Sequence, residues 1–355
     1  MHAAGGNRGA VAPGDRATAH PGAPGGAQRG AVVNALRQFA SLEQAALPAG
    51  PVHLAIGLFD GVHRGHQAVI RAAIAAARAR GGSAGVLTFE PHPSAVLRPE
   101  NPTPLLLSVA AKRQLLAGLG IDFLIEHPFT PAFAATTARD FVAQLKRALP
   151  GLETVYVGEN FRFGRGREGD IAVLQSAARE AGFTVHSAPR LSDLGAPISS
   201  SRLRDLVAAG DLAQANALLG YSYFAEGVVR PGRQLGRTLG FPTLNLVWSP
   251  GLRPAFGVYA VVVTGPDGRP QPAVANYGLR PTVETGAAEP RLEVHVLGPT
   301  GLAYGDAVRV QWLRFLRPER KFGGVEELRA QVEKDRETAR ETLARVSPEN
   351  FPKSA

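Results

Sequence analysis

The chain has 355 residues, a length that at about 150 residues per domain predicts two domains. Its 45% hydrophobic and 19% charged residues are typical of globular proteins and exclude a wholly disordered chain. The absence of Cys excludes disulfides, thiol catalysis and Cys-ligated metal centres, and no apolar run is long enough to cross a membrane. The net charge of +9 is spread along the chain, a pattern more typical of a solvated surface or of small anionic substrates than of nucleic-acid binding.

The first 31 residues are predicted to be a disordered tail. They consist mostly of Ala, Gly, Pro and Arg with scattered polar residues, and they lack the apolar side chains that packing requires. The apolar stretch of a secretory signal is also missing, and we expect a protein that acts in the cytoplasm and binds neither membranes nor nucleic acid.

Residues 32–205 are predicted to form a doubly wound α/β domain with a parallel sheet. Short apolar runs alternate there with segments of helical length, which is typical of a sheet covered by helices on both faces. The expected strands are Val52–Ile56, Ala84–Phe89, Phe123–Glu126, Thr154–Val157 and Thr184–Ser187. The expected helices are Gln67–Arg80, Val109–Leu119, Ala138–Leu149 and Ile171–Ala181.

Residues 206–222 are predicted to link this domain to a second one, residues 223–347, which is followed by a short tail over 348–355. After residue 220, β-branched runs are separated by turns with Gly and Pro, which predicts a small antiparallel β-barrel. A charged helix over about Val325–Val346 closes the domain and is expected to pack through Leu328, Val332 and Leu343. The expected strands are Gly227–Arg230, Val258–Thr264, Ala273–Asn276, Arg291–Leu297 and Ala307–Leu313.

The most informative segment, Gly57–His66, has the sequence GLFDGVHRGH and lies where a strand is followed by a helix. Backbone N–H groups and the positive end of the helix dipole meet at such a turn and form an anion site. His63 and His66 suit a polyphosphate, because imidazoles can hydrogen-bond the oxygens that gain charge as pyrophosphate leaves. Two alternatives remain: a surface or packing role for the pair, and a metal site that includes Asp60.

A second polar segment, Ile198–Arg204, has the sequence ISSSRLR. Serines before an apolar-periodic segment predict a helix N-cap. Hydroxyl groups and an Arg at a helix start can also bind phosphate, and the two roles are compatible. Nearby, GRGREG at Gly164–Gly169 matches the dinucleotide-binding pattern by chance, because the preceding strand is expected to end near Gly158.

The barrel opens with Gly232–Leu246, whose sequence is GRQLGRTLGFPTLNL. Its glycines allow backbone amides to approach a ligand closely. Thr243 and Asn245 are two residues apart in an extended segment, so they face the same side and offer neutral oxygens to a hard cation. The residues alone favour a simpler interpretation, an ordinary Gly/Pro turn followed by a strand.

From about residue 34 onward, the chain resembles the bacterial bifunctional riboflavin kinase/FAD synthetase family. Four blocks of the first domain match in order, namely GLFDGVHRGH, TFEPHP at Thr88–Pro93, VGENFRFG at Val157–Gly164, and ISSSRLR. In the barrel, GFPTLN resembles the Pro-Thr-Ala-Asn signature of riboflavin kinases, with Leu244 in place of Ala. The segments NYGLRPT at Asn276–Thr282 and LEVH at Leu292–His295 match later blocks.

The resemblance implies that the first domain is an FMN adenylyltransferase of the nucleotidyltransferase superfamily. It implies that His63 and His66 contact ATP and that Asn160 lies at the site of adenylyl transfer. Whether His92 contacts phosphate stays open. Leu58 and Ser201 stand where Asn and Thr are common in the family. The further ATP and phosphate contacts that the resemblance implies are Gly57, Phe59, Asp60, Gly65, Ser199, Ser200 and Arg204.

The same resemblance implies that the barrel is a riboflavin kinase. Thr243 and Asn245 would hold Mg²⁺ and ATP, with Gly236 and Thr238 as further ATP contacts. Glu293 would be the general base that takes the proton from the ribityl hydroxyl of riboflavin. The segment Gly298–Gly305 departs from the family, which usually has acidic residues and Phe there. Arg317 and Lys321–Phe322 match the end of the barrel without an assigned role.

The expected function is FAD biosynthesis in two ATP-dependent steps, with Mg²⁺ at both sites. Riboflavin is phosphorylated to FMN, and FMN is then adenylylated to FAD with release of pyrophosphate. The expected partners are riboflavin, FMN and ATP. The nearest rival is a nucleotidyltransferase that acts on another phosphate or carboxylate, with the barrel as a substrate-holding module. A nucleic-acid-binding protein would need a basic patch interleaved with aromatic residues, which the sequence lacks.

Overall fold

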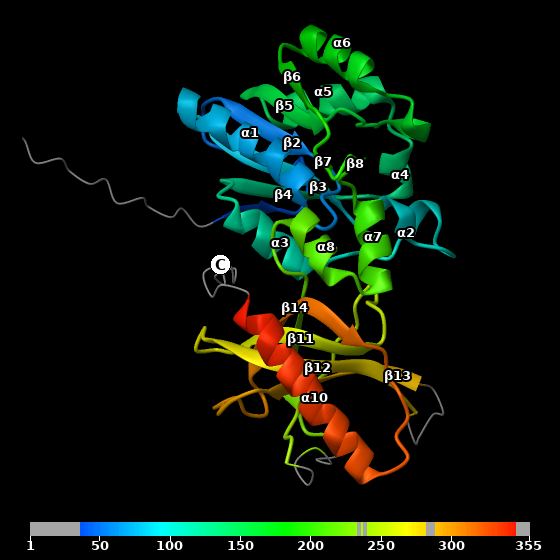
Figure 1. Cartoon of the computed structure of the whole chain (residues 1–355). Coiled ribbons are helices and arrows are strands. Elements are labelled where there is room, and N and C mark those ends of the chain that lie inside the picture. Colours follow the sequence, from blue (N-terminus) through cyan, green and yellow to red (C-terminus); the bar gives the residue numbers. More distant parts are fainter. Residues whose placement is uncertain (1–35, 233–235, 237–239, 282–287, 346–355) are drawn as a thin grey trace, which may run out of the picture. The chain divides into compact units, whose positions relative to one another are not determined.

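The computed structural model describes residues 36–232, 236, 240–281 and 288–345 (Figure 1). The first domain contains strands β1 (Arg37–Phe39), β2 (Val52–Ile56), β3 (Ser83–Glu90), β4 (Phe123–Pro128), β5 (Leu152–Gly158) and β6 (Thr184–Ala188). All six are parallel, in the order β1-β4-β3-β2-β5-β6. Because β2 lies between β3 and β5, the winding direction reverses at its carboxyl end, where ligands of such sheets bind.

Alternating strand side chains divide the core of this domain into two layers. Leu54 and Ile56 of β2 belong to one layer and Ala55 to the other, as the two-residue period of a strand requires. The Leu54 layer is packed by α5 (Ala138–Ala148) and α6 (Ile171–Ala181). The Ala55 layer is packed by α1 (Arg64–Arg80), α3 (Val109–Gly118), α7 (Ser200–Ala209) and α8 (Leu212–Leu219). The predicted doubly wound architecture is therefore confirmed.

Every predicted strand and helix of the first domain is present, with ends shifted by at most three residues. The largest shift is at the start of α1, which begins at Arg64 because His63 supplies its N-cap. The predicted linker, residues 206–222, is largely helical, and Leu212, Leu218 and Leu219 are fully buried. Short elements that the sequence did not reveal are α2 (Pro93–Leu97), α4 (Pro131–Ala134), a 3₁₀ turn at Arg165–Arg167, β7 (Ser192–Asp193) and β8 (Ala196–Pro197).

The second domain is a closed antiparallel barrel, as predicted. Its strands are β9 (Phe224–Arg230), β10 (Leu244–Leu246), β11 (Gly257–Thr264), β12 (Pro270–Pro281), β13 (Ala288–Val296) and β14 (Ala307–Arg317). They close in the order β10-β13-β12-β11-β14-β9. Trp312, Tyr223, Tyr259 and Tyr277 are among the large side chains buried in its core, where the Tyr259 and Trp312 rings meet edge to face at 4.8 Å.

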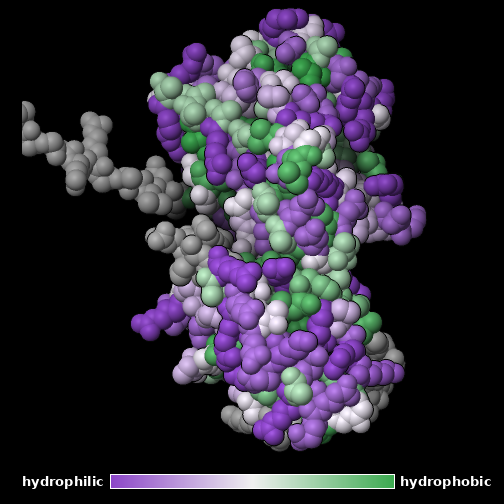
Figure 2. All heavy atoms as spheres, viewed as in Figure 1, coloured by the Kyte–Doolittle hydropathy of each residue, from purple (hydrophilic) through white to green (hydrophobic). Residues whose placement is uncertain are grey.

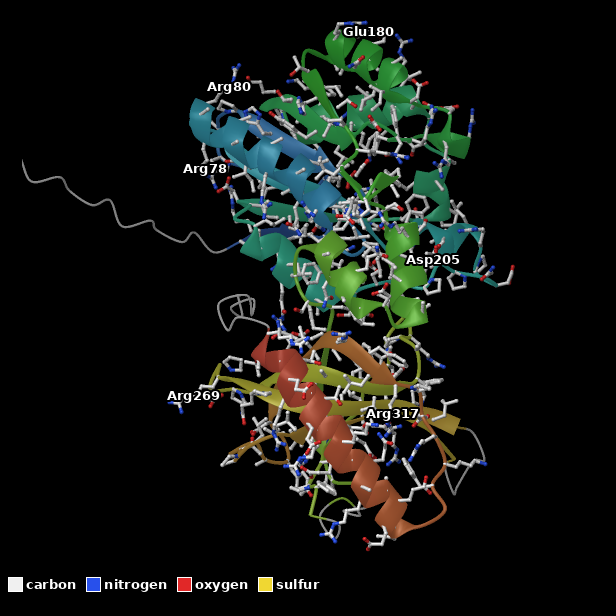
Figure 3. All side chains as sticks on the ribbon, viewed as in Figure 1. Arg78, Arg80, Glu180, Asp205, Arg269 and Arg317 are labelled. Atoms are coloured by element: carbon white, nitrogen blue, oxygen red, sulfur yellow. The ribbon has the colours of Figure 1, made fainter. Side chains whose placement is uncertain are left out.

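Helix α10 (Val325–Ala344) lies along the barrel (Figure 1). Its Ala339 and Leu343 pack on Ala260 and Val262 of β11, which confirms the predicted packing of Leu343. Leu328 and Val332 are instead only half-buried and line a pocket. Arg317, on the barrel beside α10 in Figure 3, forms an ion pair with the buried Asp335 of this helix at 2.7 Å.

Hydrophilic and hydrophobic side chains are interspersed on the face of the molecule drawn in Figure 2. Large exposed hydrophobic side chains occur in both domains, for example Leu97 and Leu194 in the first and Val247 in the second. Among the helices that the structure describes, none combines the length and the hydropathy that a membrane crossing requires.

Candidate functional site

The turn after β2 has an unusual backbone conformation. Phe59 and Val62 adopt φ angles of 51° and 34°, and Gly61 between them adopts 83°. Positive φ is uncommon for side chains of this size and persists only where surrounding contacts hold it. The turn lies at the carboxyl end of β2 and leads into α1, at the wall of a pocket of about 950 Å³. Gly57, Phe59, Asp60 and Gly65, four predicted ATP contacts, all line this pocket.

His63 and His66 lie against each other at the start of α1. The Nδ1 atom of His63 accepts a hydrogen bond from the His66 backbone N–H at 3.3 Å, so His63 is the N-cap of the helix. The two rings are stacked, with centroids 3.6 Å apart and planes 18° apart, and Phe59 meets the His66 ring edge to face at 5.3 Å. Both imidazoles line the pocket. Because His63 Nδ1 is an acceptor, the neutral ring carries its proton on Nε2, which is then a donor.

Both imidazoles are neutral at pH 7. Burial lowers the pKa of His63 to about 4. Burial, together with the neighbouring His63, lowers the pKa of His66 well below its ordinary value. The pair therefore offers neutral N–H donors to a ligand rather than two positive charges.

We expect the His63 ring to titrate near pH 4 in the free protein and the first domain to lose stability as the pH falls from 6.5 to 4. In this window the unfolded chain, with a His pKa near 6.5, binds more protons than the folded chain. The loss due to His63 is about 2 kcal/mol between pH 7 and pH 5. NMR titration measures the pKa, and His63→Gln should weaken the pH dependence of unfolding. A pKa near 6.5, with the same pH dependence in both proteins, would contradict this expectation.

Asp60 and Arg204 form an ion pair in the pocket wall. The Asp60 carboxylate is buried and accepts hydrogen bonds from the Leu106 backbone N–H at 3.0 Å and from Arg204 Nη2 at 2.6 Å. Arg204 Nε also donates to the Pro104 carbonyl at 2.8 Å. Asp60 is thus engaged by Arg204 and a backbone amide. Among the described residues, no group of three or more metal-ligating side chains is arranged to hold an ion.

The serines of the ISSSRLR segment lie at the start of α7. Ser199 is the N-cap, as predicted, and its Oγ accepts a hydrogen bond from the Arg202 backbone N–H at 3.2 Å. Ser200 Oγ donates to the Asp60 carbonyl at 2.9 Å. Both serines and Arg204 line the same pocket as the two imidazoles, so the fold brings these two distant segments together.

Aromatic side chains form another wall of this pocket. Asn160 follows β5 and lines the pocket beside Phe161 and Phe163, whose rings stack with centroids 5.6 Å apart. The matching sequence blocks contain Phe89, Phe161 and Phe163, but the sequence did not predict that these rings form one wall, because their segments meet only in the fold. A broad apolar surface next to polar groups suits a ligand with a planar ring and a phosphate. The other rings are Phe89, Phe129, Phe133 and Phe141.

His92 also lines this pocket, and it caps a helix. Its Nδ1 accepts a hydrogen bond from the Ser94 backbone N–H at 3.2 Å and lies 2.8 Å from Ser94 Oγ. His92 is thereby the N-cap of α2. Its Nδ1 is engaged in this capping contact.

A second pocket, of about 280 Å³, lies in the barrel. The strand register places Asn245 of β10 opposite Glu293 of β13, and Glu293 opposite Asn276 of β12. These three side chains form a polar row in the pocket wall, with Thr243 two residues before Asn245. A Cβ atom on Gly232 would lie 2.3 Å from Asn245 Nδ2, so a larger residue there would displace the Asn245 side chain. Gly236 also lines the pocket, and the predicted contact Thr238 lies outside the described residues.

The end of β14 and helix α10 form another part of the barrel pocket wall. Arg317 donates to Asp335 through Nε at 3.0 Å and Nη2 at 2.7 Å, and Gln331 Nε2 donates to the same carboxylate at 2.8 Å. The sequence did not predict that α10 contributes to a pocket, because the charged side chains of a helix usually face solvent. Polar pocket residues for which the sequence predicted no role include Asn276, Glu319, Asp335 and Arg336.

The polar row fits a hard divalent cation. Asn245 Nδ2 donates to the Thr243 carbonyl at 3.5 Å, which leaves Asn245 Oδ1 as an acceptor. Together with the Thr243 hydroxyl, it offers oxygen ligands of the kind that Mg²⁺ prefers.

Comparisons with known proteins match each domain separately. The family model for FAD synthetase matches residues 48–202, and the one for riboflavin kinase matches residues 219–343. The bifunctional riboflavin kinase/FMN adenylyltransferase of Escherichia coli (strain K12) is 39% identical over 295 residues, 83% of this chain and 94% of that protein. The Bacillus subtilis (strain 168) protein of the same description is 36% identical over 290 residues, 81% and 90% of the two chains. A crystal structure described as a macrolide-efflux protein from Streptococcus pneumoniae has a TM-score of 0.78 and 30% identity, and the match covers 85% of this chain and 98% of that one.

Proposed function

The chain belongs to the bifunctional riboflavin kinase/FMN adenylyltransferase family, and we propose which of its residues carry each of the two reactions. The enzyme phosphorylates riboflavin to FMN and adenylylates FMN to FAD, with ATP as co-substrate in both steps. One observation supports the assignment: each domain has its own pocket, and each pocket has polar groups suited to one reaction.

In the first pocket, a phosphate oxygen of FMN attacks the α-phosphorus of ATP, and the bond from that phosphorus to pyrophosphate breaks. We assign His63 Nε2–H and the His66 ring to the oxygens that gain charge as pyrophosphate leaves. Asp60 and Pro104 hold Nη2 and Nε of Arg204, and we assign its Nη1 to a phosphate oxygen. Ser199 and Ser200 place the start of α7, with its N–H groups, beside that phosphate.

The aromatic wall is the part of this pocket that suits the flavin ring of FMN. Phe161 follows Asn160 directly, so a ring stacked on Phe161 places its phosphate-bearing chain near the predicted site of transfer. Offset stacking between aromatic rings contributes about 0.5–1.5 kcal/mol beyond the burial of area.

Replacing Phe161 with Ala should raise the KM for FMN in FAD formation about tenfold, because the flavin loses both stacking and buried surface. The rate of FMN formation from riboflavin should stay the same. Val173→Ala is the matched control, since Val173 is an exposed side chain of α6 outside the pocket. Steady-state rates with supplied FMN measure the effect. An unchanged KM for FMN in folded Phe161→Ala would remove the aromatic wall from flavin binding.

In the barrel pocket, the ribityl hydroxyl of riboflavin attacks the γ-phosphorus of ATP, and the bond to ADP breaks. We assign Glu293 as the base that accepts the hydroxyl proton, and Thr243 and Asn245 as the residues that hold magnesium with ATP. When bound, Mg²⁺ neutralises charge on the phosphate oxygens. The ion pair between Arg317 and the buried Asp335 fixes another part of the pocket wall.

We further propose that the enzyme acts in the cytoplasm, on free riboflavin, FMN and ATP as its magnesium complex, and that it binds no nucleic acid. The Cys-free sequence fits a reducing compartment. The dispersed basic residues fit small anionic substrates better than a polyanion.

A further inference from the structure

Five consecutive backbone carbonyls of the turn before His63 are held by hydrogen bonds. Four of the donors are side chains, and they come from four different parts of the chain. The contacts are Leu58 with Thr88 Oγ1 at 3.1 Å, Phe59 with the Val62 N–H at 3.0 Å, Asp60 with Ser200 Oγ at 2.9 Å, Gly61 with the Tyr221 hydroxyl at 2.8 Å, and Val62 with Gln67 Nε2 at 2.9 Å.

These contacts fix the orientation of the peptide groups in the turn that leads to His63. In a planar trans peptide, the C=O group and the next N–H group point to opposite sides. Holding the carbonyls of Gly61 and Val62 therefore sets the directions of the Val62 and His63 N–H groups. It also holds Val62 at its strained φ of 34°, a conformation that persists only when surrounding contacts determine it.

Two of the donors tie the turn to the segment after α7. Tyr221 follows α8 and reaches Gly61 through its hydroxyl. Gln67 Nε2 donates to Val62 on one side and to the Leu219 carbonyl at 2.8 Å on the other. Gln67 is buried, and burial raises the pKa of the Tyr221 hydroxyl well above its usual value, so this group stays a neutral donor.

We propose that Tyr221 and Gln67 are positioning residues for adenylyl transfer, and that they act by holding the Gly61 and Val62 carbonyls of the turn that carries His63. The segment from Leu212 to Tyr221 is then a functional part of the adenylyltransferase site. Neither side chain lines the pocket, so neither contacts the substrate. Their effect is on the placement of His63 and the turn amides, where a displacement of about 1 Å can cost about 10²-fold in rate.

The test removes a single hydroxyl group. Tyr221→Phe keeps the ring and should lower the single-turnover rate of FAD formation, measured with enzyme in excess over FMN, about tenfold. The KM for FMN and the rate of riboflavin phosphorylation should stay within twofold of the wild type. Tyr223→Phe is the matched control, because it removes the same group two residues away, where the hydroxyl donates to Leu252 at 3.4 Å.

A second variant tests the other proposed positioning residue, Gln67. Gln67→Met preserves volume but removes the donor, and it should also slow the single turnover. In the double variant, the fold reduction in the single-turnover rate should be smaller than the product of the two single reductions, because both donors hold the same turn. If Tyr221 and Gln67 had a purely structural role, the substitutions would lower the fraction of active enzyme. The amplitude of FAD formation in the single turnover would then fall, but its rate constant would stay unchanged.

This inference rests on the proposed role of the two imidazoles in adenylyl transfer, and the two can fail separately. If His66→Ala abolishes FAD formation but Tyr221→Phe turns over at the wild-type rate, the positioning role is wrong and the site assignment stands. If His66→Ala has no effect, the site assignment itself fails. A slowed single turnover in Tyr221→Phe, with Tyr223→Phe unchanged, supports the proposal.

Discussion

His66→Ala should lower the rate of FAD formation by roughly 10²- to 10³-fold while riboflavin is still phosphorylated to FMN. The His66 ring is stacked on His63 at the start of α1 and lines the larger pocket. In the proposed reaction its neutral N–H stabilises the charge that develops as pyrophosphate leaves, and Ala supplies no such donor. The product assay is chromatographic separation of riboflavin, FMN and FAD after incubation with ATP and Mg²⁺. We expect FMN to accumulate without FAD.

A His substitution of the same kind elsewhere in the domain provides the control. His186 is an exposed residue of β6 that does not line the pocket, so His186→Ala should form FAD at the wild-type rate. Equal loss of FMN and FAD formation in folded His66→Ala would contradict the division of labour between the two domains. Normal FAD formation would remove the imidazole from the reaction.

Glu293→Gln should lower riboflavin phosphorylation by roughly 10²- to 10⁴-fold and leave the adenylylation of supplied FMN unchanged. Gln has nearly the same shape as Glu but cannot accept the proton of the attacking hydroxyl. Glu293 lies in the polar row between Asn245 and Asn276, so the substitution preserves the register of three strands. Rates of FMN formation from riboflavin, and of FAD formation from supplied FMN, measure the two activities separately.

Glu341→Gln is the matched control for this substitution. Glu341 is exposed on α10 and does not line the barrel pocket, so both activities should remain at the wild-type level. Undiminished FMN formation in Glu293→Gln would exclude Glu293 as the base. Loss of both activities would show that the change disturbs more than proton transfer.

The fold could be predicted from the sequence because its regular elements carry strong periodic signals. β2 and β3 are apolar runs buried on both faces, as strands in the middle of a parallel sheet must be. Elements whose signal depends on tertiary contacts were harder to find. β1 has three residues and, within the described part of the chain, pairs with β4 alone at the edge of the sheet. Helix α8 lies in a stretch that the sequence predicted to be a linker. Its burial could not be predicted, because it depends on the core into which Leu212 and Leu219 pack.

His63, His66, Thr243 and Asn245 could be selected from the sequence as pocket residues, since each lies in a short motif with a strand or helix boundary beside it. His63 and His66 follow a strand directly, and Thr243 and Asn245 enter one. The supporting residues could not be found in this way. Tyr221 acts on Gly61, 160 positions earlier in the chain, and Asp335 holds Arg317 from a helix with a charged, surface-like sequence. Contacts of this kind leave no local pattern.

The Asp60–Arg204 pair shows how the structure changes the interpretation of a predicted residue. The sequence offered Asp60 as a metal ligand or a phosphate contact, and Arg204 as a phosphate contact. In the structure, Asp60 accepts hydrogen bonds from Arg204 and from the Leu106 amide. A negative charge beside a polyphosphate would oppose binding, and the ion pair offsets it while it holds the guanidinium at the pocket wall.

Mixing the two variant proteins tests the presence of two independent sites most directly. Neither His66→Ala nor Glu293→Gln alone should convert riboflavin to FAD, but an equimolar mixture with ATP and Mg²⁺ should do so, because FMN released by the first variant is a substrate for the second. FAD appearing in the mixture after a lag set by FMN accumulation is the result that the account predicts. A mixture that forms no more FAD than either protein alone, although each retains its own half-reaction, would contradict it.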